Sequence, residues 1–324
     1  MGGERIDLRE VMVRRLIAAI EEGVNLVVLV SDSTSTASIG PFARRFPERL
    51  VNVGIAEQNL LGVAAGMARG GYVAVTANAA PFVVNRANEQ LKNDVCYSET
   101  NVKVVALNAG VAYGSLASTH HAIDDISIVR GMGNILILAP ADPVECDGIF
   151  RFAIAHTGPV YIRMDNLKFP ALHTPSYRFV PGAVDVLREG GDVTVFAVGS
   201  VVFEAAAAAE ALTADGISVH LVNLPSIRPL DRDAVAAAAA RTGRVVTVEE
   251  HSLHGGIGSL VCEIIAERGM GIRVSRLGIP EGSFAKAGPR ADLRRFYGID
   301  AAGIAAAARE AARGAAPGTA APRG

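Results

Sequence analysis

The stretch Val51-Asn52-Val53-Gly54-Ile55-Ala56-Glu57 passes directly from the pattern of a strand to the start of a helix. Residues Leu50 to Val53 form a short apolar run, and the segment from Gln58 to Arg69 has helical periodicity and ends at a pair of glycines. A strand that leads straight into a helix is the repeating unit of a parallel α/β sheet. Glu57 then lies at the carboxyl end of a strand, where open α/β sheets bind their ligands.

The same alternation continues on both sides of this stretch. Further apolar runs that predict buried strands lie at Asn25–Val30, Tyr72–Ala77, Val102–Leu107, Ile135–Leu138 and Val160–Ile162. Asp7 can cap a helix that carries apolar residues on one face and ends near Gly23. Continuous apolar strands separated by helices require a parallel sheet that is covered on both faces. We therefore expect an α/β domain over residues 1–170.

A second, smaller α/β domain follows. Residues 171–191 contain Pro175, Pro181 and Gly182 with little periodicity, which is typical of a linker. Residues 192–312 again alternate strands with alanine-rich helices, and residues 313–324 lack an apolar face, so we expect a disordered tail there. The expected fold class is thus α/β with two domains, each built on its own sheet.

Composition excludes several classes of protein. The chain has 324 residues and a formal net charge of −2, and it contains no basic run of the kind that binds nucleic acid or an anionic membrane. It contains no apolar segment long enough to span a membrane, and its first residues lack the pattern of a signal peptide. Three cysteines without a Cys-x-x-Cys spacing indicate reduced thiols. We expect a cytoplasmic protein without a metal site of its own.

From the residues alone, Glu57 either complements the positive end of its helix or serves as a carboxyl group in a site. Longer motifs bear on which of these two interpretations applies. Residues 44–59 closely resemble the pyrimidine-binding domain of transketolases and of their deoxyxylulose phosphate synthase relatives. The segments 86–90, 118–120, 139–142 and 158–163 follow in that family's order and spacing, and 225–231, 249–258 and 294–298 resemble its carboxyl-terminal domain. The resemblance covers nearly the whole chain.

The resemblance assigns roles to four residues near the predicted strand ends. In this family the glutamate that matches Glu57 meets the N1′ atom of the aminopyrimidine of thiamine diphosphate, and proton sharing there activates the cofactor. His120 matches a catalytic histidine, while its neighbour His121 is expected to point elsewhere. Phe82 matches the ring that stacks on the pyrimidine, and Ile55 is expected to contact the cofactor. From sequence alone, a single Phe before a helix is more often a core residue.

The motif that holds the diphosphate and its Mg²⁺ in this family, Gly-Asp-Gly followed by Asn, is missing. Gly190-Gly191-Asp192 indicates a turn into a strand, and Gly256-Ile257-Gly258 lacks the spacing of a dinucleotide fingerprint. A divalent cation and a diphosphate need a dedicated set of ligands. The resemblance therefore implies a partner, namely an N-terminal transketolase subunit that carries the diphosphate-binding domain, in an α2β2 heterotetramer.

The substrate-binding positions match the family only in part. Arg9 and Arg163 align with arginines that hold the sugar phosphate, and Thr36 with an assisting serine. In contrast, Leu116 replaces an aspartate that binds a substrate hydroxyl, and Asn108 replaces a phosphate-contacting histidine. Without the aspartate, a site loses its preference for one hydroxyl configuration. We therefore expect a substrate other than the usual pentose phosphates.

The predicted function is transfer of a two-carbon ketol unit from a phosphorylated ketose to an aldehyde, with thiamine diphosphate as cofactor. Two alternatives remain at this point. The β component of a 2-oxoacid dehydrogenase has the same two domains, although Arg9 and Arg163 favour a phosphorylated substrate instead. A non-catalytic regulatory homologue is the second alternative, and the joint presence of Glu57, Phe82 and His120 argues against it.

Overall fold

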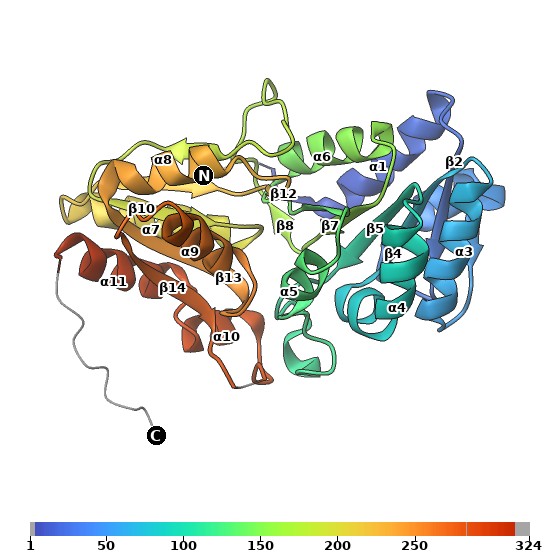
Figure 1. Ribbon diagram of the computed structural model, residues 1–324. Helices are drawn as coiled ribbons and strands as arrows, with labels where there is room; N and C mark the ends of the chain where they lie inside the picture. The colour runs from blue at the N-terminus through green and yellow to red at the C-terminus, as the bar shows by residue number, and fades with distance from the viewer. Residues whose placement is uncertain (1–3, 283, 315–324) are drawn as a thin grey trace.

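Two α/β units lie side by side in the computed structural model, which describes residues 4–282 and 284–314 (Figure 1). The first unit contains a seven-stranded sheet with the order β12-β6-β7-β5-β4-β2-β3, and the second a five-stranded sheet with the order β14-β13-β10-β11-β9. Both sheets are mostly parallel, because only β12 and β9 pair antiparallel with their neighbours. The predicted fold class is confirmed.

Apart from β12, for which the sequence predicted no strand, the strands of the first sheet lie within about two residues of the expected ranges. They are β2 (Leu26–Val30), β3 (Leu50–Asn52), β4 (Val73–Ala79), β5 (Val102–Leu107), β6 (Leu136–Leu138), β7 (Val160–Arg163) and β12 (Ser226–Arg228). A short antiparallel pair, β1 (Ile6–Asp7) with β8 (Lys168–Phe169), lies beside it. The chain runs from β2 outward to β3 and then returns to β4 on the other side of β2. This reversal leaves a crevice at the carboxyl ends of β2 and β4.

Helices cover both faces of this sheet. Apolar residues of α1 (Leu8–Glu21), α2 (Gly40–Arg45) and α6 (Pro143–Ala155) form one core cluster with the sheet. The opposite face packs against α3 (Glu57–Arg69), α4 (Asn88–Gln90), α5 (Asp125–Arg130) and two π-helical segments, η2 (Phe82–Arg86) and η3 (Leu91–Tyr97). The 3₁₀ segments η1 (Pro47–Arg49) and η4 (Gly114–Leu116) lie in the connections. Asp7 caps α1 as expected, because its side chain accepts from the Arg9 amide.

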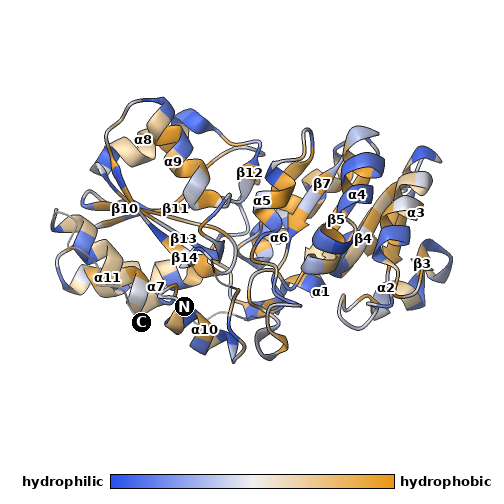
Figure 2. Cartoon of the chain, turned by 60° about the horizontal axis from the view of Figure 1, so that its bottom comes forward, coloured by the Kyte–Doolittle hydropathy of each residue, from blue (hydrophilic) through white to orange (hydrophobic). Residues whose placement is uncertain are grey.

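The second unit is a smaller sandwich of the same kind. Its strands are β9 (Asp185–Arg188), β10 (Val193–Ala197), β11 (Val219–Asn223), β13 (Arg244–Ser252) and β14 (Arg273–Ile279). Figure 2 shows α8 (Arg232–Thr242) and α9 (Ile257–Glu267) on one face and α7 (Val201–Ala214) and α11 (Ala301–Ala312) on the other, with α10 (Arg290–Phe296) at the edge. The hydrophobic colouring concentrates on the strands between these helices, where the core clusters lie.

Two short edge strands differ from the expected domain division. The segment 171–191, expected as a linker, contains β9, which pairs with β11 of the second sheet. β12 belongs by sequence to the second domain but pairs with β6 of the first sheet. Both strands are held by long-range pairing, which local periodicity does not encode. Of the expected tail, Arg313 and Gly314 form a turn after α11, and residues 315–324 lie outside the described residues. Among the described residues, we find no helix with the length and hydropathy to cross a membrane.

The junction between the two units contains a buried ion-pair network. Arg290 of α10 contacts Asp165, in the loop after β7, and Glu250 of β13, each with an N···O distance of 2.5 Å. Arg294, one turn further along α10, lies 3.2 Å from Glu250. Because the carboxylates come from different units, these arginines tie the two sheets together.

Candidate active site

A cavity of about 400 Å³ lies in the crevice at the carboxyl ends of β2 and β4. Its lining combines two carboxyls, a guanidinium, an imidazole and two aromatic rings with hydroxyl groups from several loops. The lining residues are Ser31, Asp32, Ser33, Thr36, Ile55, Glu57, Asn78, Ala79, Phe82, Arg86, Tyr113, Thr119 and His120. The structure therefore brings together five of the predicted site residues, namely Glu57, Phe82, Ile55, Thr36 and His120.

Glu57 is the first residue of α3, and only 2% of it is exposed. Gly54 turns the chain with a φ of 73° before the helix, a backbone conformation that suits glycine. The Ser31 hydroxyl fixes this turn, because it donates to the Gly54 carbonyl at 2.6 Å and accepts from the Ala56 amide at 2.8 Å. These contacts hold the buried carboxyl at the wall of the cavity.

The Glu57 carboxyl contacts side chains of the crevice. Its Oε2 atom lies 2.7 Å from Nη1 of Arg86, and Nδ2 of Asn78 lies 3.5 Å from Oε1. The carboxyl thus stands at the start of a helix and also lines the cavity, where it pairs with a guanidinium, and its role in a site stays a prediction. The Arg86 side chain is about half exposed, at 49%, so it can move when a ligand approaches the carboxyl.

The π-helical segment η2 places Phe82 and Arg86 on the same wall. The guanidinium carbon of Arg86 lies 4.4 Å from the centre of the Phe82 ring, a cation–π contact. Single π-helical turns are often found at functional sites, because the wider turn redirects side chains. Phe82 also meets the His120 ring edge-on, with 5.3 Å between the ring centres.

His120 stands between two aromatic rings. Its second neighbour is Tyr113, again edge-on at 5.3 Å. Nδ1 of His120 lies 2.9 Å from the Thr119 hydroxyl, which fixes the orientation of the ring. As expected, His121 points elsewhere: it is buried, and its Nε2 atom lies 3.0 Å from the Gly114 carbonyl.

Arg9 lies beside the cavity without lining it. Its guanidinium pairs with Asp7 at 2.6 Å and donates to the backbone carbonyls of Thr36 at 3.0 Å and Asn166 at 3.3 Å. Hydrogen bonding by Asp7 outweighs burial and raises the pKa of Arg9. Arg9 thus supports the Thr36 loop at the cavity edge and keeps part of its donor capacity for a ligand.

The structure does not bring Arg163 or Leu116 to the cavity. Arg163 is buried, and its Nε atom donates to Asp125 at 2.8 Å while Nη2 donates to the Ala122 and Glu250 carbonyls. Its guanidinium therefore serves the domain junction in this arrangement, where the resemblance suggested a phosphate contact. Leu116 is 51% exposed and does not belong to the cavity lining.

Asn108 does not line the cavity, but it is near Tyr113, which does. Asn108 is buried and has a left-handed φ of 58°. Burial raises the pKa of Tyr113, while the nearby Asn108 side chain and the charge of Arg9 oppose that rise. Tyr113 thus presents a neutral hydroxyl group at the cavity.

Sequence reasoning missed Tyr113, Arg86, Asp32 and Asn78 as site residues. Tyr113 lies in an irregular loop, where no periodicity points to it. Arg86 stood inside a motif that supported the resemblance, yet its pairing with Glu57 depends on the π-helical turn. Asp32 could have been suspected, because it follows a buried strand directly and has a left-handed φ of 52°.

The glycine motifs of the second unit serve packing, as expected. A Cβ on Gly190 would lie 2.2 Å from the backbone of Val219, so only glycine fits there. At the start of α9, the Glu249 carboxylate accepts from the amides of Ile257 at 2.7 Å and Gly258 at 2.9 Å. A carboxylate of the chain itself thus occupies the helix end that a phosphate would need.

One further group of side chains is spaced closely enough to hold a metal ion. Ligand atoms of Glu145, His173 and Asp185 all lie within 4.8 Å of one another. They already have partners within the protein: His173 bridges Asp185 at 2.8 Å and Asp142 at 3.0 Å, and Glu145 accepts from Asn223 at 2.9 Å. This group joins α6, the inter-domain segment and β9, far from the candidate active site.

A buried carboxyl and an aromatic ring at the ends of parallel strands suit a flat heteroaromatic ring with a basic nitrogen. Comparison with protein families agrees with this geometry. Residues 4–170 match the pyrimidine binding domain of transketolase, and residues 182–304 match the transketolase C-terminal domain. The chain therefore belongs to the transketolase family, which implies dependence on thiamine diphosphate.

Within this family the chain is similar to proteins that are named as transketolase subunits. It is 55% identical to an apulose-4-phosphate transketolase subunit of Actinobacillus succinogenes over 92% of this chain and 96% of that one. A 6-deoxy-6-sulfo-D-fructose transketolase subunit of a Clostridium species is 35% identical, with 94% of each chain covered. A solved split-gene transketolase, described as an inactive β4 tetramer, is 37% identical and superimposes with a TM-score of 0.87 over 95% of this chain and 99% of that one. The chain is thus a transketolase subunit of the split type.

Proposed function

We propose that this chain is the pyrimidine-binding subunit of a thiamine diphosphate transketolase that transfers a two-carbon ketol unit from a phosphorylated ketose to an aldehyde. The observation that carries the proposal is the buried Glu57 carboxyl, which faces Phe82 and His120 across one cavity. The two alternatives are less supported, because relatives of the same extent are named transketolase subunits. Apulose 4-phosphate is the first donor to test, because the relative with 55% identity is named for it.

The residues of the cavity would each have a different role. Glu57 would hold a proton at the ring nitrogen of the pyrimidine, Phe82 would stack on that ring, and the exposed Ile55 would contact the cofactor from the cavity rim. His120, oriented through Nδ1 by Thr119, would exchange a proton with a substrate hydroxyl through Nε2. The chemistry that the bound cofactor supplies is cleavage of the ketose carbon–carbon bond and storage of the two-carbon unit.

Substrate recognition would combine Arg9, Thr36 and Tyr113 at the cavity with residues that the resemblance assigned. Asn108 would act through Tyr113, because its side chain opposes the rise in the pKa of that residue. Roles for Arg163 in phosphate binding and for Leu116 in hydroxyl selection remain predictions. Arg163 would first have to leave its buried pair with Asp125.

The diphosphate and Mg²⁺ would be held by a partner, an N-terminal transketolase subunit, in an α2β2 heterotetramer of carbohydrate metabolism. The occupied start of α9 and the structural glycines support this division, since they leave no diphosphate ligands in the motifs considered. The inactive β4 tetramer of the solved relative supports it too. We place the protein in the cytoplasm, because Cys96, Cys146 and Cys262 are free thiols.

Two experiments test the proposal. Calorimetric titration of the purified chain with thiamine diphosphate and Mg²⁺ should show weak binding or none. In the complex reconstituted with the partner subunit, Glu57→Gln should slow exchange of the cofactor C2 proton by about 100-fold or more. Glu48→Gln, a change at an exposed carboxylate on η1, is the matched control. Exchange at the wild-type rate in Glu57→Gln would refute the assigned role.

A further inference from the structure

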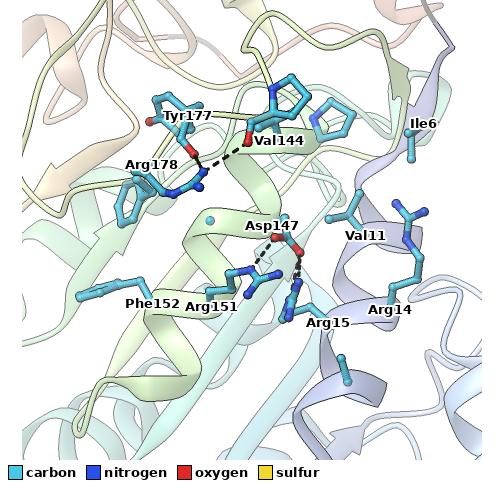
Figure 3. Close-up of a pocket in the computed structure, with 15 residues that line it drawn as sticks. Ile6, Val11, Arg14, Arg15, Val144, Asp147, Arg151, Phe152, Tyr177 and Arg178 are labelled. Atoms are coloured by element: carbon cyan, nitrogen blue, oxygen red, sulfur yellow. Dashed lines mark hydrogen bonds and ion pairs between the residues drawn. The ribbon is translucent and has the colours of Figure 1, made fainter. Parts of the chain in front are cut away.

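A second cavity lies away from the candidate active site and is lined in part by arginines. It has a volume of about 1030 Å³ and lies between α1, α6 and the segment that follows β8. Figure 3 shows the hollow: Arg14 and Arg15 approach it from α1, Arg151 from α6, and Arg178 from the inter-domain segment. No residue of this cavity lines the crevice that contains Glu57.

The lining carries a surplus of three positive charges, because Asp147 is the single carboxylate among four arginines. Arg15 donates to Asp147 at 2.7 Å and Arg151 at 2.8 Å, so this carboxylate holds two guanidinium groups in place. These hydrogen bonds outweigh burial and lower the pKa of Asp147, which therefore stays ionised. Glu22 lies 3.8 Å from Arg15 and is mostly exposed.

Two of the arginines have no carboxylate partner. Arg14 makes no side-chain hydrogen bond or ion pair with any residue in the described ranges. Arg178 donates only through Nη1, to the carbonyls of Pro175 at 3.2 Å and Tyr177 at 2.9 Å, which leaves its other donors free. A guanidinium with free donors suits the planar, two-point recognition of phosphate. The chain as a whole has a net charge of −2, so this local surplus runs against the overall balance.

The cavity also has a built apolar wall. Phe152 of α6 and Phe179 of the inter-domain segment pack together with 5.7 Å between their ring centres. The segment reaches this position because residue 148 is glycine: a Cβ there would lie 2.9 Å from the Cβ atom of Phe179. Glycine within a helix is unfavourable relative to alanine, so the close approach gives it a structural reason.

We propose that this arginine-lined cavity binds a small phosphate-bearing ligand, whose negative charge is stabilised by Arg14 and Arg178 from opposite sides of the cavity and whose remaining atoms lie against Phe152 and Phe179. The shared chemistry is a phosphate dianion, which either inorganic phosphate or a phosphorylated sugar provides. The site is distinct from the substrate site, because it lies on the face of the first sheet that α1 and α6 cover.

The test uses the full purified chain and a reporter at the site. The chain contains no tryptophan, so Phe152→Trp introduces a single tryptophan into the wall of the cavity, and its emission can be excited selectively over that of the tyrosines. Titration with ribose 5-phosphate and with inorganic phosphate, at constant ionic strength set with chloride, should change its emission to saturation. Tighter binding of ribose 5-phosphate would identify an organic ligand that uses the wall, and equal affinity would identify phosphate itself.

Variants in the same background locate the binding groups. Arg14→Gln and Arg178→Gln should each weaken binding about tenfold or more, because each removes a charge-assisted contact. Arg69→Gln, at an exposed position at the end of α3, is the matched control and should leave the affinity unchanged. Calorimetry on the same arginine variants without the tryptophan checks that the reporter does not create the site.

Three results would overturn the proposal. The first is the absence of a response to either ligand up to millimolar concentration, in both fluorescence and calorimetry. The second is equal weakening by Arg69→Gln, which would show diffuse charge attraction. The third is unchanged affinity in Arg14→Gln and Arg178→Gln, which would place binding elsewhere, for example at Arg9.

Discussion

Replacing Arg290 by methionine should destabilise the protein more than any exposed arginine change does. Arg290 donates to both oxygens of Asp165, at 2.8 and 2.5 Å, and to both oxygens of Glu250, at 2.8 and 2.5 Å. Only 11%, 6% and 4% of the three side chains are exposed. Methionine keeps much of the volume but leaves two buried carboxylates, of which only Glu250 retains a guanidinium, that of Arg294.

The magnitude follows from the charge that remains. Removing one partner from a buried ion pair costs about 3 to 5 kcal/mol, since the other charge stays buried without compensation. Urea unfolding followed by circular dichroism at pH 7 should therefore show a loss of about this size for Arg290→Met. Arg295→Met is the matched control on the same helix: its side chain is 71% exposed and pairs with an exposed Asp292, so the change should be within about 0.5 kcal/mol.

The pH dependence gives a second, independent check. Burial alone would raise the pKa values of Asp165 and Glu250, but the arginines lower both, that of Glu250 to about 2. A carboxyl with a depressed pKa stabilises the fold above its unfolded pKa of about 4, and this contribution is lost as the pH falls toward the folded value. The difference between wild type and Arg290→Met should thus shrink between about pH 5 and pH 2. A small difference at pH 7, or one that is constant with pH, would refute the reasoning.

Other positions give further expectations. Burial lowers the pKa of His173, but hydrogen bonds to Asp142 and Asp185 outweigh this and raise it to about 10, so His173→Gln should cost about 1 to 3 kcal/mol at neutral pH. Because a raised pKa stabilises below the unfolded value of about 6.5, that cost should fade as the pH rises through 10, which urea unfolding at pH 7 and pH 10 measures. In the reconstituted complex, Tyr113→Phe should raise the KM for hydroxylated substrates by about tenfold and lower kcat less, because the cavity loses a hydroxyl group that can bind the substrate. If the single substitution Leu116→Asp changes which substrates the enzyme prefers, position 116 has the role in hydroxyl recognition that the family resemblance assigned to it.

Most of the fold could be predicted because its central strands are continuous apolar runs. β5, for instance, has the predicted bounds, Val102–Leu107, and every residue in it is buried. The edge strands β9 and β12 could not be predicted in the same way. β12 has only the residues Ser226–Arg228, and its partner β6 lies about ninety residues earlier in the chain. Local pattern identifies an element that is buried on both faces, whereas an edge strand depends on what it pairs with.

The candidate site shows the same division between local and distant information. Glu57 and Phe82 could be placed from a strand end and a motif, and the cavity contains both. Arg163 is also at a strand end, as the last residue of β7, but its guanidinium pairs with Asp125, 38 residues earlier. A sequence shows at which position of an element a charged residue lies. Which distant residue its side chain pairs with depends on the packing of the fold.

The arrangement of helix ends explains why one subunit would hold only part of the cofactor. A helix N-terminus offers free amides and a partial positive charge, which suit a diphosphate. At the start of α9 these amides are taken by Glu249, and at the start of α3 stands the carboxyl of Glu57. The carboxylates at the starts of α3 and α9 would repel a diphosphate. A buried carboxyl suits a ring nitrogen that shares a proton with it. The chemistry of this chain therefore favours the pyrimidine end of the cofactor, and the positive charge that its diphosphate requires would come from the proposed partner subunit.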